Sequence, residues 1–435
     1  MKKKYLLGVL AVTLCLSACS SDDSDVDNFL NEFGNMDLKI SKEWDGINYN
    51  IERGNYGETT QGFYYYDGEN ETMLYISKET AKVIPLCTRV ECTHGTEVWA
   101  QLEETGEYLS DCDAIYRINT AVQVYNGKLY ADAECKNEEK NKALLRTELD
   151  GTDKQEVLHN LDMRLEEVDT SMGGNVGEVF MSTVDWFIYD DMVYILTEAH
   201  IKHKEEKTGK VYVDVYDLNT GERVKELFYK EYKSDDLMPS YLYVTTDAVY
   251  IGLNKYIEQG EDMLKSIIFI EINRETGASK EVTLGQDRNY IGYNYFDDKL
   301  IFGKQGGDVY LLDVDGNEEL CIELDEREKE VGMFFSKRGD YIILNPREAV
   351  KLEDGSMGYY SKIYDSEYNY LDTIYFTENF RPQAGNGDKI LYQGDDYEKY
   401  YYIDTKQIGT GNIELKEIEM PKLKKKAENE TEAEE

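Results

Sequence analysis

Three cysteines and one histidine are the residues of this chain best suited to chemistry. Cys87, Cys92, His94 and Cys112 form the pattern C-x4-C-x-H-x17-C. Three thiolates and one imidazole suit a closed tetrahedral zinc site, which would hold together a long connection with few apolar residues. The spacing is not that of a standard zinc finger, so the pattern indicates a structural zinc site without assigning it to a known class.

A disulfide is the alternative for the same residues. Outside the cytoplasm, Cys87 or Cys92 could pair with Cys112. Such a bond would close about 20 to 25 residues and stabilise the fold by roughly 3 kcal/mol, with no role for His94. Free thiols are the third reading, and the sequence leaves all three open.

The amino terminus has the order of a lipoprotein signal. A basic segment at residues 2–4 precedes an apolar segment, Tyr5 to Leu16, that is too short to span a bilayer. The closing tetrapeptide Leu16-Ser17-Ala18-Cys19 resembles the bacterial lipobox, in which the cysteine is acylated and becomes the first residue of the mature chain. We therefore expect a signal peptide at residues 1–18 and a palmitate-type anchor on Cys19, with an unmodified Cys19 after a plain secretory signal as the alternative.

The two ends of the mature chain are polar. Residues 19–37 are acidic and predict a flexible tether, and residues 421–435 predict a disordered charged tail. The formal charge is −40, and since residues 1–18 carry three lysines and no acid, the mature chain is near −43. Such a surface repels nucleic acid and anionic headgroups. Basic or neutral molecules and divalent cations are the partners compatible with it.

Residues 38–420 repeat a unit of four short strands. The unit is clearest at residues 119–158, where apolar and polar side chains alternate from Lys128 to Cys135 after an Asn126-Gly127 turn. Its second strand recurs seven times, at spacings of about 41 to 65 residues typical of propeller blades. These strands begin near Gly62, Gly127, Asp191, Asp247, Asp298, Gly339 and Gly387.

We therefore predict an all-β fold, a single β-propeller of seven four-stranded antiparallel blades, with six or eight blades, a large sandwich or a β-helix as alternatives. Blades arranged radially bury both faces of each sheet, which one sheet of some twenty-eight strands cannot do. We place the first strand of the first blade at residues 47–51 and the last outer strand within Ile413–Met420, paired with Leu38–Ser41. The Cys/His segment, residues 87–118, is inserted between blades 1 and 2.

Other motifs have simpler interpretations. Cys135 and Cys321 lie on apolar strands, and we expect both to be buried as small hydrophobic residues. His200 and His203 lack a further ligand at suitable spacing and predict a solvated loop. Residues 313–317 superficially resemble a calcium loop but lack most of its ligand series, so we expect a hairpin turn.

The run GFYYYDGENETMLYISKETAKVIPLCTRVECTHG, followed by DCDAIY and NGKLY, resembles a family. It is similar to bacterial lipoproteins that carry a propeller domain akin to that of low-density-lipoprotein-receptor-related proteins, common in Gram-positive gut bacteria. The resemblance covers the chain from about Gly57 onward, and its distinctive part runs from Cys87 to Tyr130. It implies a surface-exposed propeller and brings no activity with it.

Enzyme signatures such as G-x-S-x-G, a Walker loop or H-E-x-x-H do not occur. The sequence thus predicts a lipid-anchored, extracytoplasmic, monomeric propeller that binds a ligand or protein partner at one mouth of the central channel. A carbohydrate or an envelope protein is the expected partner. The alternative is a surface carbohydrate-active enzyme, a glycosidase or lyase, that uses channel carboxylates.

Overall fold

The computed structural model describes twelve ranges of the chain and four single residues besides. They are residues 40–48, 56–68, 72–88, 112, 114, 116, 121–134, 142–159, 161, 178–203, 206–232, 237–259, 262–285, 290–352, 355–394 and 399–418. The chain divides into two compact units, residues 1–40 and 41–435, and the fold described below is that of the second. The predicted signal peptide, tether and charged tail lie outside the described residues.

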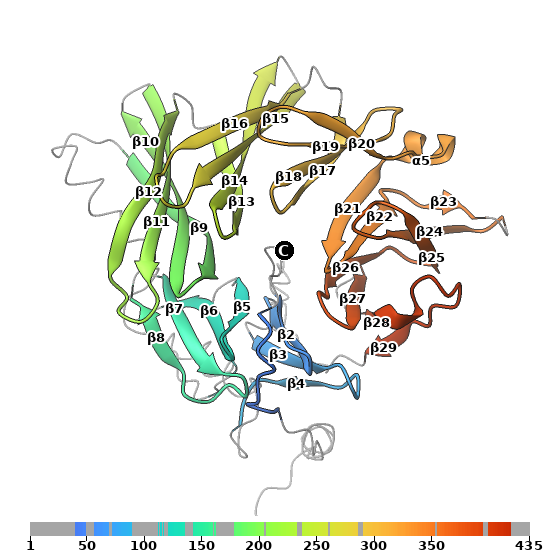
Figure 1. Ribbon diagram of the computed structural model, residues 1–435, viewed down its shortest axis with the longest axis horizontal. Helices are drawn as coiled ribbons and strands as arrows, with labels where there is room; N and C mark the ends of the chain where they lie inside the picture. Colours follow the sequence, from blue (N-terminus) through green and yellow to red (C-terminus); the bar gives the residue numbers. More distant parts are fainter. Residues whose placement is uncertain are drawn as a thin grey trace, which may run out of the picture. The chain divides into compact units, whose positions relative to one another are not determined.

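Seven antiparallel sheets, the blades, follow one another along the chain and around a common centre (Figure 1). Blades 1 to 4 contain β1 Tyr56–Glu58, β2 Gly62–Asp67, β3 Thr72–Ser77, β4 Val83–Pro85; β5 Val122–Tyr125, β6 Lys128–Glu134, β7 Lys142–Glu148, β8 Gln155–Leu158; β9 Glu178–Tyr189, β10 Met192–His203, β11 Glu206–Asp217, β12 Arg223–Tyr232; and β13 Leu237–Val244, β14 Ala248–Gln259, β15 Asp262–Asn273, β16 Ser279–Leu284. Blades 5 to 7 contain β17 Tyr290–Phe296, β18 Lys299–Lys304, β19 Val309–Leu312, β20 Glu318–Ile322; β21 Met333–Arg338, β22 Tyr341–Pro346, β24 Met357–Tyr364, β25 Tyr370–Phe376; and β26 Phe380–Ala384, β27 Lys389–Gly394, β28 Tyr400–Asp404, β29 Lys416–Ile418. A short strand, β23 Val350–Lys351, adds to blade 6 by pairing with β24.

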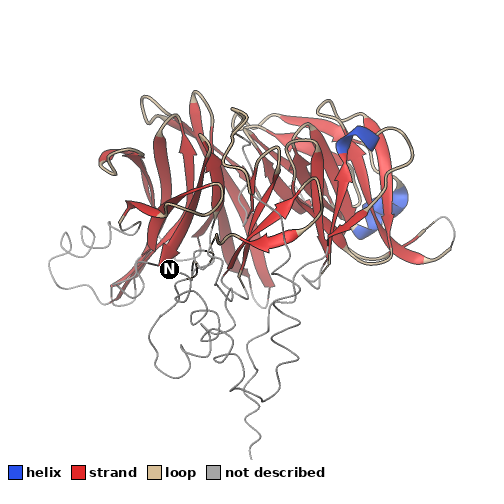
Figure 2. Ribbon diagram, turned by 90° about the horizontal axis from the view of Figure 1, so that it is seen from below, coloured by secondary structure: helices blue, strands red, loops and turns tan. Residues whose placement is uncertain are grey.

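The seven-bladed propeller is confirmed. Each predicted second strand is present, and β2, β6, β10, β14, β18, β22 and β27 all begin within two residues of the predicted positions. The described regular structure is otherwise almost entirely strand (Figure 2), apart from a helical turn α5 Glu326–Val331 and a 3-10 turn η2 Thr405–Gln407. No helix among the described residues combines the length and apolar character that a bilayer crossing requires.

Burial of both faces of each sheet explains why the blades assemble into a ring. Leu300, Ile301 and Phe302 are consecutive residues of β18, so their side chains point to alternate faces, and all three are fully buried. Each blade therefore packs against both neighbours. A large apolar cluster joins blades 3 and 4 through residues such as Leu196 and Ile251. The hydrophobic core thus lies between blades rather than within any one of them.

The first and last blades close the ring without exchanging a strand. Strand β29 is the outer strand of blade 7, as predicted. Strand β1 of blade 1 contacts β26 of blade 7. Tyr65 of blade 1 packs against Tyr400 of blade 7 in one apolar cluster. The predicted first strand at residues 47–51 is wrong, because Ile47 and Asn48 lie outside any strand and β1 begins at Tyr56. Ile40 and Ser41 are likewise in no strand, and the rest of their predicted pairing segment lies outside the described residues.

The two ends of the ring differ. We call the end at which the chain enters the first strand of each blade, and where second strands connect to third strands, the connection face; the opposite end is the turn face. The hairpins β10–β11 and β14–β15 have strands of 12 residues, whereas β2 and β3 have 6. At about 3.3 Å per residue, these hairpins are about 20 Å longer, and their tips lie at the connection face.

The long hairpin of blade 3 corrects one prediction. His200 and His203 lie in β10 and pair with Gly209 and Glu206 of β11, rather than in a solvated loop. Ala199 and Ile201 of the same strand are buried, so the alternation of apolar and polar side chains continues through this part of β10.

Candidate functional site

Two arginines and one phenylalanine gather where the inner strands of blades 6 and 7 reach the connection face. Phe334 is the second residue of β21, and Arg381 is the second residue of β26. Arg347 follows β22, and its backbone N–H donates to the carbonyl of Gly332, 3.1 Å away, just before β21. We call Phe334, Arg347 and Arg381 the two-arginine site.

Both guanidinium groups lie over the ring of Phe334. The Cζ atom of Arg381 is 4.3 Å from the ring centroid and that of Arg347 is 5.0 Å from it, within the range of cation–π attraction. Arg347 also reaches blade 5, where a Cβ added to Gly292 of β17 would lie 2.9 Å from its Nη2 atom. Glycine at this position therefore makes room for the guanidinium, and the site joins the inner strands of three blades.

The charge of the site contrasts with the charge of the chain. Burial, and then the positive charge of Arg381, lower the pKa of Arg347 below its ordinary value. Arg347 is nevertheless exposed, and in the described part of the chain no carboxylate lies within ion-pair distance of it. In a chain with 88 acidic and 48 basic residues, two close cations create a local positive field.

The polypeptide around the two-arginine site is held by a buried amide. Asn345, which is opposite Phe334 in the pairing of β21 with β22, donates from Nδ2 to Ser361 Oγ, 2.7 Å away, and to the carbonyl of Phe380, 3.2 Å away. Phe380 immediately precedes Arg381. A blade 6 side chain thus fixes the start of the blade 7 inner strand, and with it the backbone position of Arg381.

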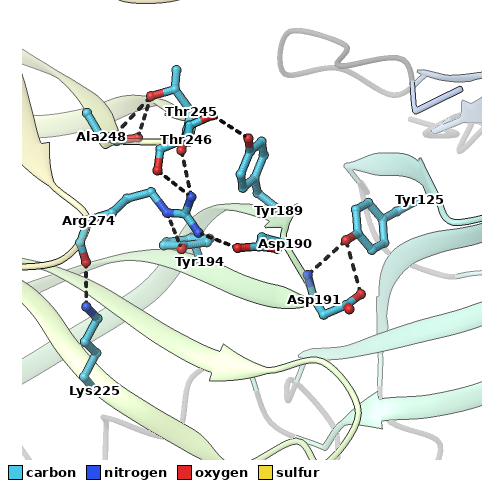
Figure 3. Close-up of polar contacts among 10 residues, drawn as sticks. All are labelled: Tyr125, Tyr189, Asp190, Asp191, Tyr194, Lys225, Thr245, Thr246, Ala248 and Arg274. Atoms are coloured by element: carbon cyan, nitrogen blue, oxygen red, sulfur yellow. Dashed lines mark hydrogen bonds and ion pairs between the residues drawn. The ribbon is translucent and has the colours of Figure 1, made fainter.

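Arg274 shows what a structural arginine looks like in this molecule (Figure 3). Its Nε donates to Tyr194 Oη at 2.8 Å, and its Nη1 donates to the carbonyls of Thr245 and Thr246 at 3.1 and 2.8 Å. Its Nη2 lies 3.5 Å from the carboxylate of Asp190. All three guanidinium nitrogens therefore have acceptors, and the side chain fastens the blade 4 turns to blade 3.

Similar bonds continue along the turn face (Figure 3). Tyr125 of blade 2 accepts the Asp191 backbone N–H at 2.9 Å and donates to the Asp191 carboxylate at 3.2 Å, which joins blade 2 to blade 3. Lys225 donates from Nζ to the carbonyl of Arg274 at 2.6 Å. These polar groups therefore join neighbouring blades at the turn face.

A buried carboxyl group lies between blades 2 and 3. Asp132 of β6 accepts hydrogen bonds from the Trp186 indole Nε1 at 3.2 Å and from the Ala121 backbone N–H at 2.9 Å. Burial raises the pKa of Asp132 to about 6, despite the opposing attraction of Lys142. Because Asp132 is held between two packed sheets, its role is structural and its ionisation affects the stability of the ring.

The structure places two of the four predicted metal or disulfide residues. Cys87 lies two residues beyond β4, and Cys112 is buried in the connection to β5. Cys92 and His94 lie outside the described residues, as does the lipidation residue Cys19. Over the part of the chain that the structure describes, no three His, Cys, Asp or Glu side chains are grouped to hold a metal ion. Zinc and disulfide both remain predictions.

The remaining sequence motifs behave as structural features. The Cys321 thiol donates to the carbonyl of Val309 at 3.3 Å, and burial raises its pKa to about 12, so it is an unreactive packing residue. Cys135 lies outside the described residues. Asp313 accepts hydrogen bonds from the Asn317 side-chain amide at 2.8 Å and from its backbone N–H at 2.9 Å, which lower the pKa of the Asp313 carboxyl group. These bonds confirm the hairpin turn. His200 lies 3.3 Å from the Glu198 carboxylate on the same strand.

Sequence reasoning did not identify the two-arginine site. Its residues come from three segments that are separated along the chain by 13 and 34 positions, and no motif marks any of them. The available signal was that Phe334 and Arg381 precede the predicted second strands near Gly339 and Gly387, where a propeller places the first strands of its blades around the centre.

Comparisons with known proteins give only distant structural likenesses. No protein-family model matches the chain, and no curated protein matches its sequence. The computationally designed Ika8 protein is 10% identical, with a TM-score of 0.43 over 84% of this chain and 86% of its own. The propeller domain of the trilobed protease from Pyrococcus furiosus, described as having an open velcro topology, is 10% identical, with a TM-score of 0.38 over 86% and 96%.

BamB from Moraxella catarrhalis is 12% identical, with a TM-score of 0.28 over 66% of this chain and 80% of its own. Likenesses of this strength carry no functional information. The assignment of the propeller therefore rests on the strand order and pairing of the chain itself.

Proposed function

We propose that this chain is a lipid-anchored, extracytoplasmic β-propeller that binds a ligand or a partner protein on its connection face. The observation that carries this proposal is the two-arginine site. A rigid ring presents a pair of cations at the connection face, and Arg347 is exposed, unlike Arg274 on the turn face. Binding sites of this kind commonly occupy the end of a ring of strands, where several elements converge.

The order of charged, apolar and lipobox segments before Cys19 supports the anchor and the location. The net charge of −40 supports a partner other than nucleic acid. We propose a monomer, since the ring closes within one chain. These features also agree with membership of the propeller lipoproteins that the chain resembles.

The Cys/His connection belongs to the same proposal. It runs from the end of β4 to the start of β5, a fourth-to-first connection like those at the connection face. We propose that zinc bound by Cys87, Cys92, His94 and Cys112, or a disulfide to Cys112, gives this long connection a fixed shape.

Two experiments test the proposal. Cell fractionation of the wild type and of Cys19→Ala tests the anchor: the variant should leave the membrane fraction, and an unchanged distribution would contradict lipidation. Incubation of the mature chain with envelope polysaccharides tests the activity: we expect retention without release of reducing ends. Release of reducing ends that one Asp or Glu substitution abolishes would instead establish an enzyme.

A further inference from the structure

We propose that the turn face of blade 2 lies against the lipid bilayer, so that the ring presents its connection face outward. This inference rests on the proposed lipid anchor and adds the orientation in which the anchor holds the ring. It commits to one partner for the turn face, the membrane surface that carries the acylated Cys19. The observation that carries the proposal is the path of residues 41–48, which join the predicted tether to the ring and which we call the entry segment.

The entry segment is fixed across two turns of blade 2. Lys42 Nζ donates to Thr152 Oγ1 at 2.7 Å and lies 3.2 Å from the Asp150 carboxylate, in the turn between β7 and β8. Asn48 Oδ1 accepts the Asn126 backbone N–H at 2.8 Å, in the turn between β5 and β6. Both turns belong to the turn face, where first strands connect to second strands and third strands to fourth strands.

Packing of Trp44 reinforces the path between these two turns. A Cβ added to Gly127, in the turn between β5 and β6, would lie 3.0 Å from Trp44 Cβ, so the tryptophan rests directly on that turn. Trp44 is half-buried, and its indole Nε1 donates to the carbonyl of Ile47 at 3.0 Å. The chain from Cys19 therefore joins the ring at the turn face of blade 2.

The length of the tether limits how far this point lies from the membrane. Cys19 is 22 positions before Ser41. A flexible tether of that length, as the sequence predicts, has a root-mean-square span of about 25 Å. With the connection face toward the bilayer, the hairpins of blades 3 and 4 would stand between the bilayer and the entry segment. Their strands of 12 residues span about 40 Å, and a tether stretched over that distance loses conformational entropy.

Energy transfer between the ring and the bilayer tests this orientation. The lipidated full chain is reconstituted into phosphatidylcholine vesicles that contain a lipid with a fluorescent acceptor on its headgroup. A short donor-labelled tag is inserted at one of two ends of blade 3: between the exposed Asn219 and Thr220, at the turn face, or between β10 and β11, at the connection face. Transfer from the turn-face tag should be at least twofold greater, because the strands separate the two tags by about 40 Å. Equal transfer, or greater transfer from the connection-face tag, would overturn the inference.

Two variants test whether the entry segment sets the orientation. The double variant Lys42→Ser/Asn48→Ala removes the bonds to Thr152 and Asn126. It should reduce the difference between the tags by half or more while partitioning into vesicles stays unchanged. Glu43→Gln alters an exposed side chain of the same segment and should preserve the difference. A double variant that keeps the full difference would contradict the role of the entry segment.

The same vesicles distinguish this inference from the anchor on which it rests. If the wild type does not partition into them, or if Cys19→Ala partitions equally well, the proposed anchor is wrong and the inference fails with it. If the wild type partitions through Cys19 but the two tags transfer equally, the orientation is wrong and the anchor stands. Greater transfer from the turn-face tag, reduced in the double variant, supports both.

Discussion

Removal of the Lys78 charge should weaken the closure of the ring. Lys78 Nζ lies 2.7 Å from Glu58 Oε1, and the two side chains are 3% and 0% exposed. Glu58 also accepts the backbone N–H of Asn386 at 2.7 Å, and Lys78 lies 3.3 Å from Asp388, so the pair joins blade 1 to blade 7. Lys78→Met would leave a buried carboxylate without its cation.

The magnitude follows from the burial. Breaking a buried ion pair from one side costs about 3–5 kcal/mol, because the remaining charge has lost its compensation. Domains are stable by only about 5–15 kcal/mol, so this is a large fraction. Burial already raises the pKa of Glu58 above its ordinary value. Protonation of Glu58 at low pH removes the buried charge, so the cost of Lys78→Met should decrease as the pH falls through that raised pKa.

Urea denaturation followed by circular dichroism measures this effect in a double-mutant cycle. We expect Lys78→Met to be strongly destabilised, and the Glu58→Gln/Lys78→Met double variant to recover part of the loss, with a coupling of at least about 1 kcal/mol. Lys399→Met is the matched control, since Lys399 of blade 7 forms a half-exposed pair with Glu378 in the connection from blade 6, and it should cost less than about 1 kcal/mol. A Lys78→Met cost as small as that of the control would refute the reasoning.

Three further predictions concern the blade interfaces and the Cys/His connection. Burial raises the pKa of Asp132 from 3.8 to about 6, so the folded state binds its proton more tightly than the unfolded state does. The free energy of unfolding should therefore fall by about 3 kcal/mol as the pH rises from about 4 to 7. Denaturation at these two pH values should show no such fall in Asp132→Asn, and an unchanged fall in the variant would contradict this prediction. Arg274→Ala should lower the free energy of unfolding by about 2–4 kcal/mol, because it leaves the Thr245 and Thr246 carbonyls without donors. Amide hydrogen exchange at the blade 3 and blade 4 turns should become faster in this variant. Unchanged exchange there would show that Arg274 does not hold these turns together. Native mass spectrometry of the mature chain should show bound zinc or a deficit of two hydrogens, and the absence of both would rule out either form of the site at Cys112.

The second strands were predictable from sequence because each carries its own signal. In the run Lys128 to Ala133, a turn pair precedes alternating side chains, and the whole pattern lies within one hairpin. The strand β1 was not predictable. It is three residues long, has glycine at its centre and ends in the buried Glu58, which is stable there only because Lys78 and Asn386 are brought to it by the fold. Local periodicity instead favoured residues 47–51.

The candidate site was beyond sequence reasoning for a related physical reason. Phe334, Arg347 and Arg381 become neighbours only when blades 6 and 7 pack side by side, and Gly292 matters only because Arg347 crosses to blade 5. The Cys/His pattern was easier to detect because its residues are close in sequence. The sequence motif thus identified the Cys/His site, whereas the two-arginine site could be identified only from the packing of the blades.

A crystallographic map of the mature chain tests the central claim most directly. We expect seven radial sheets with β1 beside β26, and the guanidinium groups of Arg347 and Arg381 over the ring of Phe334 at the connection face. A map with two separate β-lobes, or with these two arginines on different faces of the ring, would contradict the account.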